Sequence, residues 1–363
     1  PSSRIDLKNL NRRELTDFVV NQGLSPYRGR QIFSWLFRPG ITEIEQMTDI
    51  AKKVRRSLEG QVFLSRLEIA DKEISEDGSV KYAFRLADGH IIESVLIPEE
   101  KRQTLCISSQ VGCAMGCSFC LTATMGFIRN LTPAEITGQI TAVQDDIAGS
   151  DKTGINNIVF MGMGEPLVNL DNLVKSLEIL MDDLGLNFSD RRITVSSCGI
   201  PHKIRELGRR IRVNLAISLH AADNETRSRL MPVNKTYPVE EVLAACRDYP
   251  LPKRKRIMFE YALIKGVNDS PEDARKLAGL LRDIPCKINL IRCNEIPEQS
   301  SASELNRFRA SSPERTAEFQ QILRDANFGV FLRASRGADI SAACGQLAGQ
   351  QGSEKRMADN NSK

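Results

Sequence analysis

Three closely spaced cysteines are the residues whose types and spacing most directly indicate chemistry. Cys113, Cys117 and Cys120 lie in the run VGCAMGCSFC, which gives the pattern C-x₃-C-x₂-C. A closed zinc site needs four ligands and iron–sulfur clusters are usually held by four thiolates, yet residues 121–130 contain neither Cys nor His. The pattern predicts an iron–sulfur cluster with one iron left open for a substrate or cofactor. The alternative is a zinc knuckle with a distant fourth ligand, although zinc ligands normally come as paired half-sites.

Polar residues follow several predicted strands at the points where the strands end. The run GMGEP at Gly162–Pro166 directly follows a predicted strand at Ile158–Met161. Its glycines would let the backbone approach a ligand, and the Glu165 carboxylate could accept hydrogen bonds from an amino group; a simple tight turn is the alternative. The carboxyl ends of parallel strands meet on one rim, which should also hold residues that end later strands. These are Ser196, Ser197, the run Ser218-Leu219-His220, and Asn294.

For the hydroxyl groups and the imidazole at these strand ends, the alternative is a side chain that is satisfied within the fold. Two further cysteines could reach the same rim. Cys106 lies on the first strand of the alternating region, and Cys344 lies in a loop after the last strand. Glu93 interrupts an apolar strand, where a solvent-facing edge residue is the simpler interpretation unless a pocket lies beside it. The remaining cysteines are interpreted as small buried hydrophobic residues: Cys198, Cys246, Cys286 and Cys293.

The charge distribution bears on the partner. The 363 residues carry a net charge of only +4, but Arg and Lys occur in local groups. Phosphate binding depends on local potential, so the number of these groups favours a nucleic-acid partner, although any one of them could be a solvated surface. The groups are Arg55-Arg56, Arg191-Arg192, Arg209-Arg210 with Arg212, Lys253–Arg256, and Arg333 with Arg336.

Cysteine usage and hydropathy bear on the compartment. The chain has nine cysteines, and its first residues show no charged segment followed by an apolar one. No apolar run approaches the roughly 18 residues that a membrane span needs. We therefore expect a cytoplasmic protein without a membrane partner, whose cysteines are thiols or ligands.

The hydrophobic pattern divides the chain into four parts. Helical spacing from about Asn11 to Glu59 predicts an accessory domain at residues 1–60, a candidate for nucleic-acid binding. Three β-leaning runs predict a small β meander at residues 61–100. Residues 101–348 are expected to form the main domain, and the polar tail at 349–363 is expected to be disordered.

In the main domain, strand-like and helical segments alternate. This alternation predicts an α/β fold of six β/α units around a parallel sheet, with functional residues at the carboxyl ends of the strands. Thr132-Pro133 with Glu135 is a capping box with proline at the first helical position, and Ser270-Pro271 and Ser312-Pro313 repeat the cap-plus-proline signal. The expected strands are Leu105–Ser108, Ile158–Met161, Ile193–Ser196, Val213–Ser218, Ile257–Leu263 and Lys287–Ile291, with a last strand at Gly329–Arg333.

The chain resembles the RlmN/Cfr family of radical S-adenosylmethionine (SAM) RNA methyltransferases, and within it the RlmN branch, which methylates C2 of adenine. The similarity runs from about Leu7 to Gly349. The C-x₃-C-x₂-C spacing is the known signature of radical SAM chemistry. The other matching runs are Thr104–Cys113, Gly126-Phe127, Arg129–Thr132, Met161–Pro166, Ser218–His220 and Ala342–Leu347.

The resemblance implies a partial (β/α)₆ barrel with an N-terminal accessory domain. It also implies two RNA substrates, adenosine 2503 of 23S rRNA and adenosine 37 of tRNA. An electron donor such as a flavodoxin system would be a further partner, and we expect a monomer.

The resemblance further implies a protein-bound methyl carrier, because C2 of adenine is electron-poor and cannot attack the SAM methyl. Cys344 would take a methyl group from one SAM and become S-methylcysteine. A second SAM, bound to a [4Fe-4S] cluster on Cys113, Cys117 and Cys120, would be cleaved to a radical that removes a hydrogen from this methyl. The carbon radical would then add to C2 and link protein and RNA.

Release of that link is implied to require Cys106, through a transient disulfide with Cys344. Glu93 matches the position assigned as the proton acceptor, and the sequence leaves open whether Glu93 or Cys106 removes the C2 proton. The SAM-binding residues implied by the resemblance are Gly164, Glu165, Ser196, Ser218, Leu219, His220 and Asn294.

Two departures bear on the branch and the substrate. Cfr-type enzymes, which methylate C8, have alanine where this chain has Pro166, which favours the C2 interpretation. Residues 291–303 differ from the usual family pattern, which affects expected substrate contacts and not the chemistry. The alternatives are a Cfr-like C8 methyltransferase, a radical SAM enzyme acting on a small molecule, and a non-catalytic RNA-binding module with a structural metal.

Overall fold

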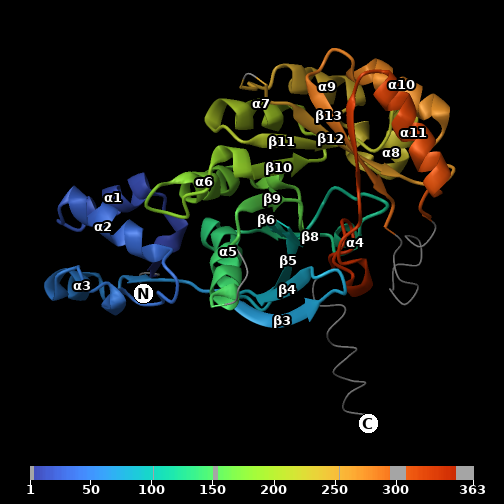
Figure 1. Cartoon of the computed structure of the whole chain (residues 1–363). Coiled ribbons are helices and arrows are strands. Elements are labelled where there is room, and N and C mark those ends of the chain that lie inside the picture. Colours follow the sequence, from blue (N-terminus) through green and yellow to red (C-terminus); the bar gives the residue numbers. More distant parts are fainter. Residues whose placement is uncertain (1–3, 101, 150–153, 253, 295–307, 349–363) are drawn as a thin grey trace, which may run out of the picture.

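The structure is a computed structural model that describes residues 4–100, 102–149, 154–252, 254–294 and 308–348. The tail expected to be disordered, at 349–363, lies outside these residues. One ten-stranded sheet organises the molecule, in the order β14-β13-β12-β11-β10-β9-β6-β5-β4-β3. Figure 1 shows this sheet curling around the centre of the main domain, with helices on its outer side.

Seven strands of this sheet, β6 and β9 to β14, are parallel and correspond to the strands expected from the sequence. The predicted α/β fold and partial barrel are therefore confirmed. The parallel strands are β6 (Arg102–Cys106), β9 (Asn157–Phe160), β10 (Ile193–Ser197), β11 (Asn214–Ser218), β12 (Ile257–Leu263), β13 (Cys286–Arg292) and β14 (Gly329–Arg333).

The β meander is continuous with this sheet. Strands β3 (Glu68–Ile74), β4 (Val80–Arg85) and β5 (Ile91–Glu99) are antiparallel, and β5 also pairs with β6. The first barrel strand begins at Arg102, earlier than the expected Leu105, because Arg102 and Gln103 pair with the end of β5. The expected boundary between residues 100 and 101 thus falls between two hydrogen-bonded strands.

The helices of the main domain follow the parallel strands in turn, and the predicted helix starts are present. Thr132 caps α5 with a capping box to Glu135, and Ser270 and Ser312 cap their helices with proline at the first helical position. The helices are α5 (Pro133–Ile147), α6 (Leu170–Met181), α7 (Pro201–Arg210), α8 (Asn224–Leu230), α9 (Val239–Arg247), α10 (Pro271–Leu281) and α11 (Pro313–Asp325).

The first β/α connection, between β6 and α5, is long and carries the cysteine cluster. It contains the two-stranded ladder of β7 (Gln110–Gly112) and β8 (Phe127–Asn130), with α4 (Leu121–Thr124) between them. The core lies between the sheet and its helices, where Ile136, Ile140 and Val143 of α5 are buried. Among the described residues, no helix is long and apolar enough to cross a membrane.

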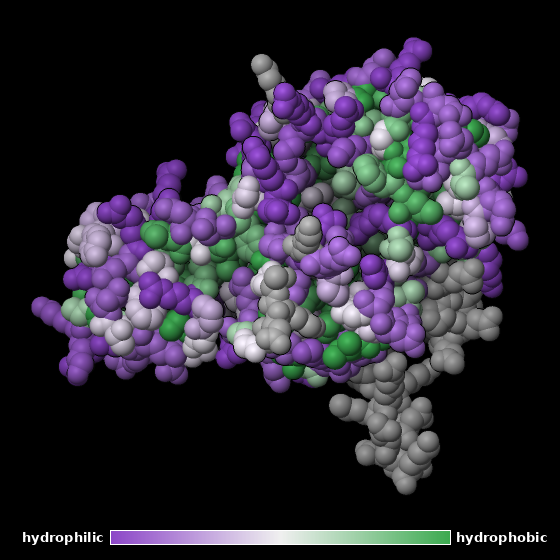
Figure 2. Space-filling view, viewed as in Figure 1, coloured by the Kyte–Doolittle hydropathy of each residue, from purple (hydrophilic) through white to green (hydrophobic). Residues whose placement is uncertain are grey.

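The N-terminal segment forms a separate hydrophobic cluster around α1 (Arg12–Asn21), α2 (Pro26–Leu36) and α3 (Lys52–Leu58). It rests on the main domain, since Ile179 of α6 belongs to its cluster and Asn11 Nδ2 donates to Glu178 Oε2 at 2.7 Å. Figure 2 shows hydrophobic residues gathered where this lobe meets the main body, on a surface that is otherwise mostly hydrophilic. The two-residue strands β1 (Ile5–Asp6) and β2 (Val62–Phe63) pair and close the lobe.

Candidate active site

A single cavity at the carboxyl ends of the parallel strands brings together residues that are far apart in the sequence. Each cysteine of the C-x₃-C-x₂-C run lines it, and so do Cys106 and Cys344. The sequence-predicted residues that line the cavity are Cys106, Cys113, Cys117, Cys120, Gly164, Glu165, Ser196, Ser197, Ser218, His220, Asn294 and Cys344. Leu219 and Glu93 are not among the lining residues.

The backbone of the cysteine loop is held by the β7–β8 ladder. Gly112 has a positive φ of 70°, and a Cβ there would lie 1.8 Å from the Gly126 carbonyl oxygen, so only glycine fits. The next amide, of Cys113, donates to the same carbonyl at 2.8 Å. This contact ends the ladder and turns the chain toward the cavity.

The three cysteines of the loop are free thiols that are only partly exposed. Burial raises the pKa of Cys113 to about 12, and burial together with the neighbouring Cys120 and Cys113 raises the pKa of Cys117. Three thiolates this close repel one another and are poorly solvated, so a positively charged metal centre is what would make them stable. The donor set therefore fits a cluster bound by three thiolates.

A zinc knuckle fits less well. Among the described residues, no group of three or more His, Cys, Asp or Glu side chains is arranged to hold one metal ion. Ligands of an iron–sulfur cluster bind different iron atoms and do not have to converge on one point. The position of all three cysteines in the lining of one cavity is thus compatible with a cluster.

The GMGEP run lies against Gln110 at the start of β7. A Cβ at Gly164 would lie 2.5 Å from Gln110 Cβ, which explains the glycine, and Gln110 Oε1 accepts from the Glu165 amide at 2.8 Å. The buried Glu165 carboxylate accepts from the amides of Leu167 at 3.0 Å and Cys198 at 2.7 Å. Burial raises the pKa of Glu165. The side chains of Cys198 and Ser197 also hydrogen-bond to this carboxylate, which lines the cavity.

His220 has a fixed orientation and tautomer. Its φ of 57° is in the left-handed region, and its Nδ1 accepts from the Ala262 amide at 2.9 Å, so the proton lies on Nε2. The ring lies edge-on to Phe119, in the cysteine loop, with centroids 4.9 Å apart. Burial lowers the pKa of His220 to about 3, which leaves a neutral imidazole with one N–H donor.

Arg227 supports the rim from beneath, and its role was missed from the sequence. This fully buried guanidinium donates to the carbonyls of Leu219 at 3.1 Å and Cys198 at 2.5 Å. Leu219 is itself buried in the core, and its amide donates to the Glu260 carbonyl at 3.0 Å. Leu219 therefore shapes the rim through its backbone, and its side chain does not face the cavity.

The two candidate reactive thiols differ in environment. Cys106 ends β6 and is buried, which together with nearby Cys344 raises its pKa to about 12. Cys344 is exposed toward the cavity, and its carbonyl accepts from Asn294 Nδ2 at 3.0 Å. Although Cys344 is exposed at the cavity, the protein atoms around its thiol reduce solvation by water and raise its pKa, whereas the neighbouring Arg333 lowers that pKa. All nine cysteines are free, so a Cys106–Cys344 disulfide is not present.

Glu93 is not a solvent-facing edge residue, which was the simpler interpretation of its sequence position. Strand β5 is an inner strand of the sheet, and Glu93 is buried. Its Oε2 accepts from the Ala348 amide at 3.0 Å, and its carbonyl accepts from Ser108 Oγ at 2.6 Å. The carboxylate thus contacts the end of the loop that carries Cys344.

Arg333 and Glu260 also line the cavity and were not recognised as site residues. Arg333 and Arg336 form one of the basic groups that the sequence analysis connects with a nucleic-acid partner, and both line the cavity because β14 ends at its mouth. Glu260 interrupts the apolar strand β12 as Glu93 interrupts β5, and a buried carboxylate in such a strand was the available signal. Its Oε1 accepts from Asn289 Nδ2 at 3.1 Å.

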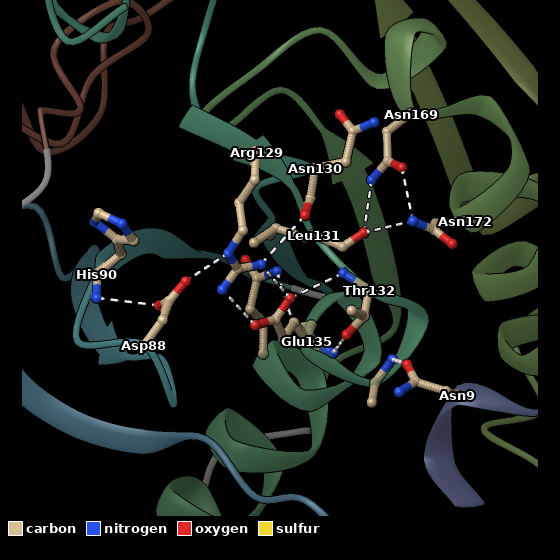
Figure 3. A network of polar contacts seen from close by, with 12 residues as sticks. Asn9, Asp88, His90, Arg129, Asn130, Leu131, Thr132, Glu135, Asn169 and Asn172 are labelled. Atoms are coloured by element: carbon tan, nitrogen blue, oxygen red, sulfur yellow. Dashed lines mark hydrogen bonds and ion pairs between the residues drawn. The ribbon is translucent and has the colours of Figure 1, made fainter. Parts of the chain in front are cut away.

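A polar network anchors the far side of the cysteine loop (Figure 3). Arg129 of β8 donates to both oxygens of Glu135, at 2.9 and 2.8 Å, and to Asp88 Oδ2 at 2.6 Å. Asn169 donates to the Leu131 carbonyl at 2.7 Å. The network joins the loop to α5, to the β4–β5 turn and to the segment after GMGEP.

The class of protein follows from this fold and from comparison with known families. The model of the radical SAM superfamily matches residues 107–278, which include the cysteine loop and the parallel strands β9 to β12. The model described as the ribosomal RNA large subunit methyltransferase N-terminal domain matches residues 5–64. The fold and the cysteine loop are those of a radical SAM enzyme.

Relatives define the family more closely. The chain is 53% identical to a dual-specificity RNA methyltransferase RlmN from Desulfotalea psychrophila, covering 95% of each chain. It is also 53% identical to the protein of that name from Geobacter sulfurreducens, over 95% of this chain and 92% of the relative. A radical SAM methyltransferase from Sphaerobacter thermophilus has a similar crystal structure, with a TM-score of 0.86, 42% identity, and coverage of 94% and 99%. The chain belongs to the RlmN family of radical SAM methyltransferases, whose cofactors are a [4Fe-4S] cluster and SAM.

Proposed function

We propose that this chain methylates C2 of adenosine in both 23S rRNA and tRNA, at adenosine 2503 and adenosine 37. The relatives' name, which specifies RNA methyltransferases of dual specificity, supports the substrates. The observation that carries the chemistry is the meeting of three separate segments at one cavity: the cysteine loop, Cys106 and Cys344. A simple hydrogen-abstracting enzyme would not need the last two.

In this proposal Cys113, Cys117 and Cys120 hold the [4Fe-4S] cluster, and the rim binds SAM. When bound, the cluster and SAM supply a methyl group and a 5′-deoxyadenosyl radical. Glu165 would accept hydrogen bonds from the SAM ammonium, and the Nε2–H of His220 would donate to an acceptor on the same ligand. The other proposed SAM-binding residues are Gly164, Ser196, Ser218, Asn294 and, through its backbone, Leu219.

Cys344 is the proposed methyl carrier. Its thiolate is the nucleophile that accepts a methyl group, and Arg333 favours that thiolate electrostatically. After hydrogen loss from the S-methyl group, the carbon radical adds to C2 of the adenine and links protein and RNA. The ring radical that results must lose one electron, for which the oxidised cluster would be the acceptor, and the C2 proton must be removed. The Cys106 thiolate then attacks the Cys344 sulfur and forms a disulfide, while the electron pair of the broken sulfur–carbon bond stays on the carbon, which takes up a proton and becomes the methyl group.

Glu93 is the proposed proton acceptor, with Cys106 as the alternative. Cys106 lines the cavity, whereas Glu93 contacts the cavity through the Cys344 loop, by accepting from the Ala348 amide. If the Glu93 carboxylate takes the C2 proton, Glu93→Gln should slow release of the RNA. If Cys106 takes that proton, Glu93→Gln should leave the rate of release unchanged.

RNA would also contact the accessory domain at residues 1–60. A surface groove between α1 and α2 is lined by arginines and the exposed ring of Tyr27, groups that bind phosphates and stack on bases. We further propose that the enzyme acts in the cytoplasm as a monomer, with an electron donor such as a flavodoxin system. RNA as the substrate supports this compartment.

Mass spectrometry of RNA from a strain that lacks this gene tests the proposal. Adding back the wild-type chain should restore 2-methyladenosine in 23S rRNA and tRNA. Adding back Cys344→Ala should not, whereas Cys246→Ala, which removes a buried thiol outside the cavity, should. Restoration of 8-methyladenosine, or of no methylated adenosine, would contradict the proposed function.

A further inference from the structure

The segment that carries Cys344 bridges two parts of the sheet that are far apart in sequence. It follows β14 at residue 334 and is described to residue 348; we call residues 334–348 the carrier loop. In Figure 1 the chain after β14, drawn in red, reaches the region of α4 and β4. β14 and β3 are the two edge strands of the ten-stranded sheet, so the carrier loop crosses the open side of the barrel.

One side of the carrier loop contacts the cysteine loop. The Leu121 amide donates to the Gly345 carbonyl at 2.7 Å, and Thr122 Oγ1 donates to the Leu347 carbonyl at 2.7 Å. A turn between Ala343 and Gln346, closed by the Gln346 amide at 3.0 Å, presents Cys344 to the cavity. These contacts are made to backbone carbonyls of the carrier loop, and none of them involves the Cys344 thiol.

The other side contacts the turn between β3 and β4, and here the contacts are made by two carboxylates. Asp77 Oδ2 accepts from the Gly337 amide at 2.9 Å, and its Oδ1 accepts from the Ser79 amide at 2.8 Å. Asp339 Oδ1 accepts from Ser75 Oγ at 2.6 Å, and its Oδ2 accepts from the Glu76 amide at 3.1 Å. Asp339 therefore joins the carrier loop to the turn with both oxygens, whereas Asp77 reaches the carrier loop through Oδ2 and uses Oδ1 within the turn.

Lys81 adds a third contact. Its Nζ donates to the Ile340 carbonyl at 2.7 Å while it pairs with Glu73 at 2.9 Å. In the sequence, Glu76-Asp77-Gly78 has the composition of an ordinary hairpin turn, and nothing local relates it to a loop about 260 residues later. Only the fold shows that their polar groups are directed at the carrier loop.

We propose that Asp77 and Asp339 are positioning residues that fix Cys344 over the cysteine cluster, so that the β3–β4 turn is a working part of the active site. The functional consequence rests on the proposed role of Cys344 as methyl carrier. The same sulfur would have to meet a methyl donor, a radical and an RNA base in turn. A displacement of about 1 Å in such a reaction can cost on the order of a hundredfold in rate.

The two carboxylates differ in a way that makes the proposal testable. Asp77 accepts from the backbone amides of Gly337 and Ser79, which can only donate, and the hydroxyls of Ser79 and Ser75 also contact its carboxylate. An Asn at 77 has one acceptor oxygen in place of two, so it can keep at most one of the two amide contacts in this geometry. One partner of Asp339 is the Ser75 hydroxyl, which can rotate and accept, so an Asn at 339 can satisfy both contacts. Asp77→Asn should therefore release the carrier loop, and Asp339→Asn should nearly preserve it. Hydrogen bonds from Ser79 and Gly337, which outweigh the effect of burial, lower the pKa of Asp77 to about 2 and agree with this reading.

The experiment measures Cys344 directly in the anaerobically prepared full chain. Alkylation of Cys344 by iodoacetamide, followed by peptide mass spectrometry, reports the accessibility of the thiol before any RNA is added. Asp77→Asn and Asp339→Ala should raise the alkylation rate several-fold, and should lower both S-methylation of Cys344 and RNA methylation about ten- to hundredfold. Iron content should equal that of the wild type.

Asp339→Asn and Asp171→Asn are the matched controls. Asp171 is a surface carboxylate paired with Arg210 at 2.6 Å, away from the carrier loop. Both controls should behave like the wild type. Unchanged alkylation and methylation in Asp77→Asn would overturn the proposal, and so would loss of iron or of the folded state, which would make the turn a folding element only. If wild-type Cys344 never carries a methyl group, the proposed function fails, while the alkylation difference still decides whether the carboxylates hold the loop.

Discussion

At the scale of single residues, similar side chains differ in function because their surroundings differ. Cys106 and Cys344 line one cavity, but Cys106 is buried at a strand end and Cys344 is exposed on a loop. An exposed thiol on a loop can approach several reactants in turn, whereas a buried thiol has one direction of attack. This contrast agrees with a carrier at 344 and a resolving thiol at 106.

Replacing Cys106 by Ala should trap an intermediate. Without a thiol to attack the Cys344 sulfur, the sulfur–carbon bond to the adenine cannot break, so protein should stay covalently attached to RNA. A denaturing gel with radiolabelled RNA detects the linked species. The Cys106→Ala, Cys344→Ala double variant is the control and should show no link. A single variant that turns over normally would refute the release step.

His220 should make the fold sensitive to mild acid. Burial lowers its pKa in the folded state to about 3, whereas the ordinary value is 6.5. As pH falls from about 6.5 toward 3 the unfolded state binds a proton that the folded state excludes, so the free energy of unfolding decreases over that window.

The variant His220→Asn tests this pH dependence, because Asn tolerates a positive φ. Urea unfolding midpoints at pH 7 and pH 5 should fall less for the variant than for the wild type. An equal fall for both proteins would show that His220 is not the group responsible.

At the scale of elements, the cysteine loop depends on anchors outside it. Arg129 ties β8 to α5 and to the β4–β5 turn, while the carrier loop contacts α4 from the other side. The ion pairs of Arg129 raise its pKa, chiefly through hydrogen bonds to Glu135. The three cysteines therefore supply the ligands, and the elements around the cysteine loop fix where those ligands lie.

Arg129→Met should loosen the cysteine loop without removing a ligand. Because the ion pairs are partly exposed, the expected loss of stability is only about 1 kcal/mol. Iron release to a chelator should nevertheless become several-fold faster, which absorbance of the cluster can follow. Arg275→Met, which removes an exposed ion pair with Glu272 on α10, is the control. Equal release rates for the two variants would argue against the anchoring role.

At the scale of the whole molecule, we expect the accessory domain to bind RNA and the cavity to carry out the chemistry, so a substitution in one should leave the other intact. Arg13→Gln with Arg30→Gln, in the groove between α1 and α2, should weaken RNA binding and reduce its salt dependence. Methylation of Cys344 needs SAM only and should not change. Arg282→Gln, on the exposed end of the α10 region, should affect neither. Loss of Cys344 methylation in the double variant would contradict the separation.

Much of the fold could be predicted because the relevant signals are local. Alternating strands and helices, and the caps at Thr132, Ser270 and Ser312, are short-range patterns, and the structure has them. The cysteine spacing is local as well. The matching run around Cys344 came from a family resemblance, since no local pattern connects it to the cluster.

What could not be predicted depends on contacts between distant segments. The meander extends the barrel sheet because β5 pairs with β6, and Arg333 faces the cavity because β14 ends there. Glu93 looked like an edge residue because the sequence of a strand does not show which strands lie on either side of it. The contacts of Asp77 and Asp339 between the turn and the carrier loop had no signal in the sequence, since the two segments meet only after folding.

Isotope transfer through Cys344 tests the central claim most directly. The anaerobically reconstituted protein, which should be brown with about four irons per chain, is supplied with SAM whose methyl group is deuterated, and then with RNA under reducing conditions. Mass spectrometry should find the deuterated methyl first on Cys344 and then, with one deuterium lost, on C2 of adenosine. Transfer to RNA with all deuterium retained, or without label ever appearing on Cys344, would contradict the account.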